Sequence, residues 1–375
     1  MKNSKKIKIL HITQVQGGVQ TYIEQIFTNV DKEKFEMVLA CPSEREGIVK
    51  MAAKHGLPRV KLEIPIKISP LTDLRCILAA VKLIKELKPD IIHSHSSKAG
   101  VIARVAGLLV KPKVIYTPHA YAYLCHTGLT RFFFMAIEKM AIPLTNVLLA
   151  TSGSEAKRSL IDVRFPAKKV EIYTNSIEIL PLPEKQGQKS IKNVTMVGRL
   201  VTQKNPMMFV RVCKALTEMR EDVFCHIIGA GFDDQWKDLI EKYIEQHGLQ
   251  KKLTIVQWMD RADLLSALRN TDVFVMTSAF ESFGYVAAEA QMLEVPVVAT
   301  NVDGFNEIIE SGVTGYLVEP GDVQGMTEKI NDILNDPEGA AQMGRKGRLR
   351  VSELFDIRKN IHQLEDFYLK HATAS

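Results

Sequence analysis

Two glutamates, Glu281 and Glu289, stand where side chains could act on a bound ligand. They follow the short apolar run Asp272-Val-Phe-Val-Met276, which predicts a buried strand. The alanine-rich residues 285–292 predict a helix, and Gly284 just before them lets a ligand approach the backbone. A strand–turn–helix junction leaves N–H groups free at the positive end of a helix dipole, where anions bind.

A second group of polar residues follows an earlier predicted strand, in Gly198-Arg-Leu-Val-Thr-Gln-Lys-Asn205. Arg199 at the strand end and Lys204 before the next helix can both project over the carboxyl edge of a sheet, where ligands bind. Two cations there suit a diphosphate whose charge grows as a glycosidic bond breaks. In isolation these would be two solvated surface cations. In the glutamate loop, Ser282 suits a helix N-cap.

Together, Glu281-Ser-Phe-Gly followed by Glu289, and Gly-Arg-Leu followed by Lys204-Asn205, resemble the signatures of retaining glycosyltransferases of family 4. The resemblance extends over nearly the whole chain. It implies the GT-B fold, in which two Rossmann-like domains with doubly wound parallel sheets face a central cleft. It also implies that the last helix crosses back to the first domain.

The resemblance also implies a role for each residue of these motifs. Arg199 and Lys204 correspond to the diphosphate-binding pair of the family. Glu289 resembles the carboxylate that accepts both ribose hydroxyls, and Glu281 the one aimed at the sugar ring. Sugar or phosphate would meet the backbone amides of three consecutive residues, Phe283, Gly284 and Tyr285.

Two features of the first half complete the resemblance. Gly17 and Gly18, after the first predicted strand, resemble the family's first glycine loop, although a plain tight turn is the alternative. His119, just past a strand end, resembles the histidine that contacts the transferred sugar, although a buried structural histidine is the alternative. Gly-x-Gly-x-x-Gly is completed neither here nor at Gly229-Ala-Gly231, which argues against a dinucleotide-dependent oxidoreductase.

We expect no metal and no cofactor. A metal-dependent sugar-nucleotide enzyme would normally carry Asp-x-Asp, and this sequence has none. His93 and His95 can point to one face of a strand, but no third ligand has a suitable spacing in the sequence. We therefore interpret that pair as structural.

The elements that must position these residues alternate between strand and helix, which predicts right-handed βαβ units and parallel sheets. Predicted strands of the first half are 7–11, 35–41, 60–64, 90–95, 113–118, 146–150 and 170–173, and those of the second are 193–198, 223–229, 253–257, 271–276, 296–299 and 315–318. We expect a first, acceptor-binding domain over 1–180, a linker over 181–191, a nucleotide-sugar-binding domain over 192–355 and a returning helix within 356–375.

Composition suggests which partners the chain meets. Residues 1–180 carry 27 Lys and Arg against 15 Asp and Glu, a net charge of +12, and the remainder carries 22 against 28, or −6. A basic first half fits an anionic membrane surface better than nucleic acid, because it contains no nucleic-acid motif; a solvated basic surface is the alternative. Five scattered cysteines and no signal-peptide core favour the cytoplasm, with peripheral contact at the inner face of the plasma membrane.

Residues 129–140 carry apolar side chains at helical spacing, which predicts a stripe facing the core. Phe134 falls outside that stripe and is predicted to be an exposed aromatic that could touch lipid.

Two segments depart from the family pattern. Asn175-Ser-Ile-Glu178 stands where Asn-Gly-(Ile/Val)-Asp is frequent, and Asp303-Gly304 where Gly-Gly is usual.

The sequence thus predicts a metal-independent, retaining glycosyltransferase. It would move a hexose or N-acetylhexosamine from a nucleotide-diphospho-sugar to a glycan or lipid-linked glycan in bacterial cell-surface polysaccharide assembly. UDP-sugars are favoured over GDP-mannose as donors. The alternatives are a non-catalytic sugar-nucleotide-binding subunit and, less favoured, the oxidoreductase.

Overall fold

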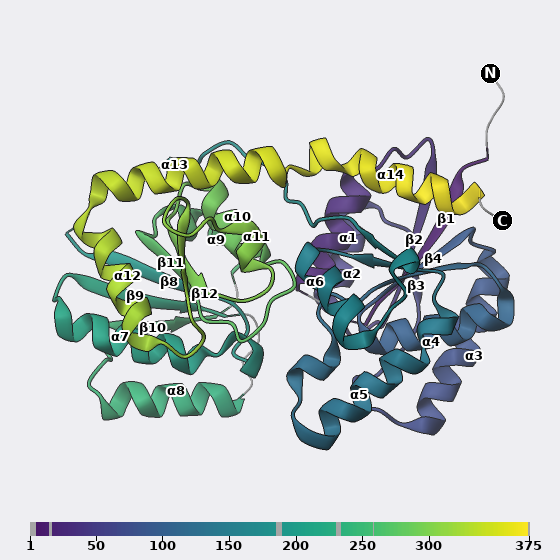
Figure 1. The fold of residues 1–375 in the computed structure, drawn as a ribbon, viewed down its shortest axis with the longest axis horizontal. Helices are drawn as coiled ribbons and strands as arrows, with labels where there is room; N and C mark the ends of the chain where they lie inside the picture. Colours follow the sequence, from purple (N-terminus) through teal and green to yellow (C-terminus); the bar gives the residue numbers. More distant parts are fainter. Residues whose placement is uncertain (1–4, 15–16, 185–189, 230–233, 258, 374–375) are drawn as a thin grey trace. The chain divides into compact units, whose positions relative to one another are not determined.

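The computed structural model describes residues 5–14, 17–184, 190–229, 234–257 and 259–373. The chain divides into unit 1, residues 1–178 with 357–375, and unit 2, residues 179–356. Each unit is a parallel sheet with helices on both faces, which confirms the predicted fold class (Figure 1). The predicted linker corresponds to the first residues of unit 2, and its residues 185–189 lie outside the described part of the chain.

The sheet of unit 1 has seven strands in the order β3-β2-β1-β4-β5-β6-β7. Its strands are β1 (Ile7–Ile12), β2 (Phe35–Cys41), β3 (Arg59–Lys61), β4 (Ile91–His95), β5 (Lys113–Thr117), β6 (Val147–Ala150) and β7 (Val170–Ile172). Helices α1 (Gly18–Asn29), α2 (Glu46–His55) and α14 (Ile357–Thr373) lie on one face, and α3 (Pro70–Leu87), α4 (Ser97–Val110) and α5 (Gly128–Met140) on the other (Figure 1). The short α6 (Gly153–Arg158) follows β6.

The sheet of unit 2 has six strands in the order β10-β9-β8-β11-β12-β13. Its strands are β8 (Lys192–Val197), β9 (Val223–Ile228), β10 (Leu253–Val256), β11 (Val273–Met276), β12 (Val297–Thr300) and β13 (Gly315–Val318). Its helices are α7 (Pro206–Met219), α8 (Asp234–Gln246), α9 (Arg261–Arg269), α10 (Tyr285–Met292), α11 (Phe305–Ile308), α12 (Val323–Asn335) and α13 (Pro337–Leu354).

The central strands are apolar runs because both faces of a parallel sheet are covered by helices. All four residues of β11 are buried, and so are the last four of β1. In each sheet the strand order reverses at one pair of neighbours, β1 with β4 in unit 1 and β8 with β11 in unit 2. Crevices outside the carboxyl ends of such a pair are the usual ligand sites of doubly wound sheets.

Helix α14 returns to unit 1, as predicted. Its first residue, Ile357, donates its backbone N–H to the carbonyl of Ile177 at 2.9 Å, and Arg358 forms an ion pair with Glu178 at 2.6 Å. Further along, the hydroxyl of Tyr368 lies 2.7 Å from Nδ1 of His93. The unusual Asn175–Glu178 segment therefore anchors the returning helix.

The orientation predicted for α5 was wrong. Its apolar stripe faces outward, and four of its residues are exposed: Leu129 at 88%, Phe132 at 72%, Phe133 at 51% and Met140 at 70%. Phe134, predicted to be exposed, is half-buried and stacks on His126 with ring centroids 4.5 Å apart.

The physical reason is a buried polar contact on the inner face of α5. Glu138 accepts hydrogen bonds from Arg104 and from the hydroxyl of Tyr116, each at 2.9 Å. Burying a carboxylate requires such partners, so this contact fixes which side of the helix meets the sheet. Across the described residues, none of the helices is both long enough and apolar enough to span a bilayer.

Candidate donor and sugar sites

The loops that follow β8 and β11 are joined by hydrogen bonds at the point where the strand order of unit 2 reverses. Thr277 donates its hydroxyl to the carbonyl of Lys204 at 2.9 Å. Ala279 donates its N–H to the carbonyl of Gln203 at 2.7 Å, and the Gln203 amide donates to Phe280 O at 3.3 Å. These bonds bring the predicted cation loop against the predicted glutamate loop.

Lys204 and Glu281 form an ion pair as a result. Nζ of Lys204 donates to Oε2 of Glu281, and their side chains are only 17% and 10% exposed. The carbonyl of Glu281 accepts the N–H of Gly304 at 3.0 Å. Arg199 lies two residues beyond β8 and is exposed. The structure thus brings one predicted cation into direct contact with the predicted sugar-facing carboxylate and leaves the other at the same sheet edge.

Helix α10 spans Tyr285–Met292, as predicted, but Ser282 does not cap it, so that part of the prediction was wrong. Its N-cap is Gly284, with φ of 102°, a left-handed conformation that favours glycine. A side chain at Gly284 would put Cβ 2.6 Å from the ring of Phe305. The first N–H groups of a helix lie at the positive end of its dipole, so the start of α10, just after Phe283, is where an anion would bind.

The loop carrying Gly304 packs closely on this turn. A Cβ at Gly304 would lie 2.5 Å from the backbone nitrogen of Phe283, so only glycine fits there. The single glycine of Asp303-Gly304 therefore supports the turn.

Glu289, the predicted ribose ligand, is 3% exposed and lies inside α10. Its Oε1 is 2.7 Å from Nη1 of Arg261, whose side chain is 41% exposed. Arg261 is the first residue of α9, and the carboxylate of Asp260 caps that helix by accepting the N–H of Asp263 at 3.0 Å. Sequence reasoning missed Arg261; the Asp-Arg-Ala-Asp capping pattern was the available signal.

The predicted residues of unit 1 gather at the carboxyl edge of its sheet. Gly17, with φ of 78°, caps α1, which starts at Gly18; residues 15–16 before them lie outside the described part of the chain. His119 follows β5. The ring of Tyr22 from α1 packs edge-on against the His119 ring, with ring centroids 4.8 Å apart. The glycine loop and His119 are thus connected through the first turns of α1.

The backbone at His119 is unusual, because His119 and Ala120 have φ of 52° and 76°. Two adjacent non-glycine residues in this conformation are strained and need support from the surroundings. The N–H of Ala120 donates to Glu155 at 2.9 Å, and the other oxygen of that buried carboxylate accepts the N–H of Thr151 at 2.8 Å. Glu155 is a second residue that sequence reasoning missed.

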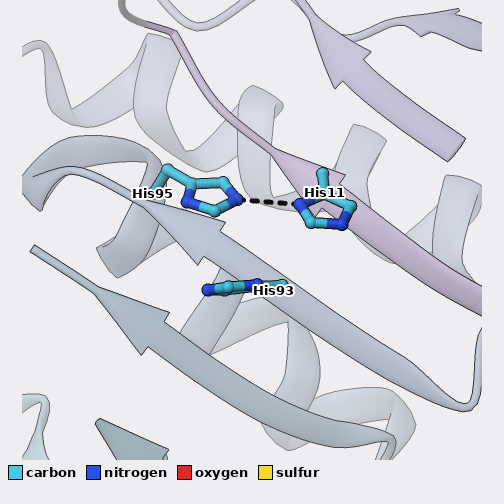
Figure 2. A group of neighbouring side chains, drawn as sticks. All are labelled: His11, His93 and His95. Atoms are coloured by element: carbon cyan, nitrogen blue, oxygen red, sulfur yellow. Dashed lines mark hydrogen bonds between the residues drawn. The ribbon is translucent and has the colours of Figure 1, made fainter. Parts of the chain in front are cut away.

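Figure 2 shows three buried histidines, His11 from β1 with His93 and His95 from β4. The sequence offered no third partner for the pair, but the structure supplies His11, because β1 and β4 are neighbours and His11 lies opposite His93. Ring nitrogens of the three lie within 4.8 Å of one another. Burial lowers the pKa of His11 to about 3 and the pKa values of His93 and His95 well below 6.5.

Residues 16–179 match the family described as Glycosyltransferase Family 4, and residues 182–350 match Glycosyl transferases group 1. The chain is 26% identical over 385 residues to the Escherichia coli UDP-Gal:alpha-D-GlcNAc-diphosphoundecaprenol alpha-1,3-galactosyltransferase, covering 97% of both proteins. It is 28% identical over 321 residues to the capsular polysaccharide biosynthesis glycosyltransferase CapM of Staphylococcus aureus, covering 81% of this chain and 83% of CapM.

Solved structures are similar over their full length. Anabaena HepE in complex with UDP and glucose has a TM-score of 0.83 at 21% identity, covering 96% of this chain and 99% of HepE. Sucrose-phosphate synthase from Thermosynechococcus elongatus has a TM-score of 0.82 at 18% identity, covering 99% of this chain and 100% of the synthase. These similarities show the GT-B fold. With the two family matches following one another along the sequence, the chain belongs to the group 1 glycosyltransferase family.

Proposed function

We propose that this protein is a retaining, metal-independent glycosyltransferase. It moves a hexose or N-acetylhexosamine from a UDP-sugar to a glycan or lipid-linked glycan during bacterial cell-surface polysaccharide assembly. The observation that carries the proposal is the Lys204–Glu281 ion pair beside the start of α10, where the strand order of unit 2 reverses. This arrangement puts a cation, a carboxylate and helix N–H groups at one sheet edge.

Each residue of the site has a role in this proposal. Lys204 and Arg199 bind the diphosphate and stabilise the charge that develops on departing UDP. Because an ammonium has three N–H donors, Lys204 can hold a phosphate oxygen and still contact Glu281, which orients the sugar. Glu289 binds the ribose hydroxyls, and the amides of 283–285 meet phosphate or sugar. No divalent ion is needed, because the two cations supply the positive charge.

In unit 1 we assign His119 to the sugar and the Gly17-Gly18 loop to close backbone approach by donor or acceptor. The strained backbone of His119 and Ala120 supports this assignment, since such strain is concentrated at functional sites.

Relatives support the donor and acceptor classes. The name of the E. coli relative specifies a UDP-Gal donor and a diphosphoundecaprenol-linked acceptor, and CapM is named for capsular polysaccharide biosynthesis. A UDP-glucose complex of the structurally similar HepE supports a uridine nucleotide.

We also propose that α5 contacts an anionic membrane on the cytoplasmic side, where a lipid-linked acceptor would lie. Its exposed stripe of Leu129, Phe132, Phe133 and Met140 can enter the headgroup region. The net charge of +12 over residues 1–180 complements acidic lipids. Phe132→Asp should reduce co-sedimentation with phosphatidylglycerol vesicles, whereas Leu349→Asp, at an exposed leucine of α13, should not. Equal binding of both variants would contradict the membrane role of α5.

The transfer itself is tested by UDP release from a panel of UDP-sugars in excess EDTA, with a lipid-linked glycan acceptor and NMR of the product anomer. We expect metal-free transfer with retention of configuration. An absolute requirement for Mg²⁺ or Mn²⁺ would contradict the role of Lys204 and Arg199. Binding without turnover of any acceptor or water would favour the non-catalytic subunit.

A further inference from the structure

Three histidines form a hydrogen-bonded row across the centre of the unit 1 sheet. Nδ1 of His11 lies 3.0 Å from Nε2 of His95, and Nδ1 of His95 lies 3.0 Å from Nε2 of His119. Ring planes of His11 and His95 are within 3° of parallel (Figure 2), and those of His95 and His119 are 34° apart. The row runs from the buried interior at β1 to the partly exposed His119.

The protons of this row are not independent. Burial lowers the pKa of His11 and of His119 to about 3, and lowers the pKa of His95 well below 6.5. Each ring is therefore neutral at neutral pH and carries a single proton, on one of its two nitrogens. Because both nitrogens of His95 are engaged, it donates on one side and accepts on the other. Only two arrangements are consistent: all protons on Nδ1, or all on Nε2.

The inner end of the row distinguishes the two arrangements. Nε2 of His11 is buried and has no hydrogen-bond partner among the described residues. With all protons on Nε2, it would be a buried N–H without an acceptor. With all protons on Nδ1, Nε2 of His11 is instead a buried acceptor without a donor. Buried N–H groups without an acceptor are rarer than buried acceptors without a donor, so the arrangement with all protons on Nδ1 is favoured.

We propose that His11 and His95 are positioning residues that keep the proton of His119 on Nδ1, so that this ring meets the donor sugar as a hydrogen-bond donor. Nδ1 of His119 has no hydrogen-bond partner among the described residues, so its N–H is available to a sugar oxygen. The sugar contact rests on the proposed function, but the proton position does not.

Ring nitrogens of His11, His93 and His95 are close enough together to hold a metal ion, but their hydrogen bonds oppose a metal site. Thr117 donates its only hydroxyl proton to Leu149 O at 2.8 Å, so Nε2–H of His93 must donate to Thr117 Oγ1, also at 2.8 Å. Nδ1 of His93 then accepts the hydroxyl of Tyr368 at 2.7 Å. A tetrahedral zinc site needs nitrogen lone pairs that converge about 2.0–2.1 Å from the ion. The lone pairs of His93 and His95 are already directed at protons, which leaves only Nε2 of His11 with an unused lone pair.

Two-bond ¹⁵N–¹H correlation NMR of histidine-labelled, ligand-free protein tests the proton position directly. His119→Gln identifies the His119 signals by their loss. We expect wild-type His119 to show a protonated Nδ1 and a bare Nε2. A proton on Nε2 of wild-type His119 would overturn the proposal, and this measurement needs no folded variant of His95.

Two substitutions of His95 test its hydrogen bonds to His11 and to His119 separately. The Asn amide nitrogen can take the place of Nδ1 and still donate to His119, whereas the Gln amide reaches the place of Nε2 and contacts only His11. His95→Gln should give His119 a mixture of tautomers and lower kcat about tenfold, with the Kd for UDP unchanged. His95→Asn should preserve the wild-type tautomer and most of kcat. A tautomer unchanged in His95→Gln would overturn the proposal.

Metal content and turnover complete the test. About one equivalent of zinc in the purified protein, lost in His95→Gln, would overturn the hydrogen-bonded row. The expected tautomer in a protein that neither binds nor turns over any UDP-sugar would support the row and contradict the proposed function.

Discussion

Replacing Glu289 by Gln should weaken the binding of UDP itself. In our account the carboxylate accepts hydrogen bonds from the ribose diol, a part of the donor that does not react. Hydrogen bonds to a charged group contribute about 1.5–3 kcal/mol, which corresponds to about 10–150-fold in Kd. Gln retains one carbonyl oxygen, so we expect the lower part of that range.

The structure indicates why folding should survive this change. Arg261, which forms an ion pair with Glu289, is 41% exposed and can turn its guanidinium to water when the carboxylate is removed. Arg261 also holds one oxygen of the Glu289 carboxylate in place. Arg261→Met should therefore alter the orientation of Glu289 and weaken the binding of UDP by a smaller amount, about 0.5–1 kcal/mol.

Calorimetric titration with UDP and with 2′-deoxy-UDP isolates the diol contact. Wild type should lose affinity when the 2′-hydroxyl is absent, whereas Glu289→Gln should bind the two nucleotides almost equally. Glu241→Gln, at an exposed residue of α8, is the matched control and should behave as wild type. If Glu289→Gln binds UDP within about twofold of wild type, or discriminates the two nucleotides as wild type does, then Glu289 does not bind the ribose.

Four further outcomes follow from the geometry. Lys204→Met should lower kcat about 10²–10³-fold in UDP release, because its charge stabilises the leaving group; an effect on KM alone would contradict this role. Gly284→Ala should lower the urea midpoint by an amount equivalent to about 1–3 kcal/mol, since the new methyl group meets the ring of Phe305 in a strained backbone; an unchanged midpoint would refute the packing. Glu138→Leu should destabilise unit 1 by about 3–5 kcal/mol in the same assay by leaving the guanidinium of its partner buried and unpaired, and a neutral effect would contradict that pairing. The free energy of unfolding should fall as pH drops from 6.5 towards 3, because His11, His93, His95 and His119 have lowered pKa values and protonate only when unfolded. In urea titrations between pH 6.5 and 5, each histidine should lower the free energy of unfolding by up to about 1.4 kcal/mol per pH unit, and His11→Asn should reduce that slope.

Local patterns were sufficient for the fold. Alternating apolar runs and helices predicted the parallel strands, because these follow from periodicity and from the βαβ rule. The return of the last helix was predicted from the family resemblance. In unit 2 the sequence identified the strands whose carboxyl ends carry Lys204 and Glu281, so the placement of both residues at one edge of the sheet was foreseeable, but their direct contact was not.

Contacts that depend on strand order were not foreseeable. His11 and His93 are far apart in the chain and meet only because β1 lies beside β4. Helical spacing identified the stripe on α5 but not its direction, which is set by the buried contact of Glu138 with Arg104. Arg261 was missed because its partner, Glu289, comes from a different helix.

The central claim is that one site in unit 2 both binds a nucleotide-diphospho-sugar and performs the transfer. The most direct test is Glu281→Gln, measured for UDP affinity and for single-turnover transfer from the intact UDP-sugar. Because Glu281 addresses the sugar and not the nucleotide, UDP should bind within about threefold of wild type while the transfer rate falls about 10²-fold or more. Loss of UDP binding with an unchanged rate at saturating donor would contradict the account.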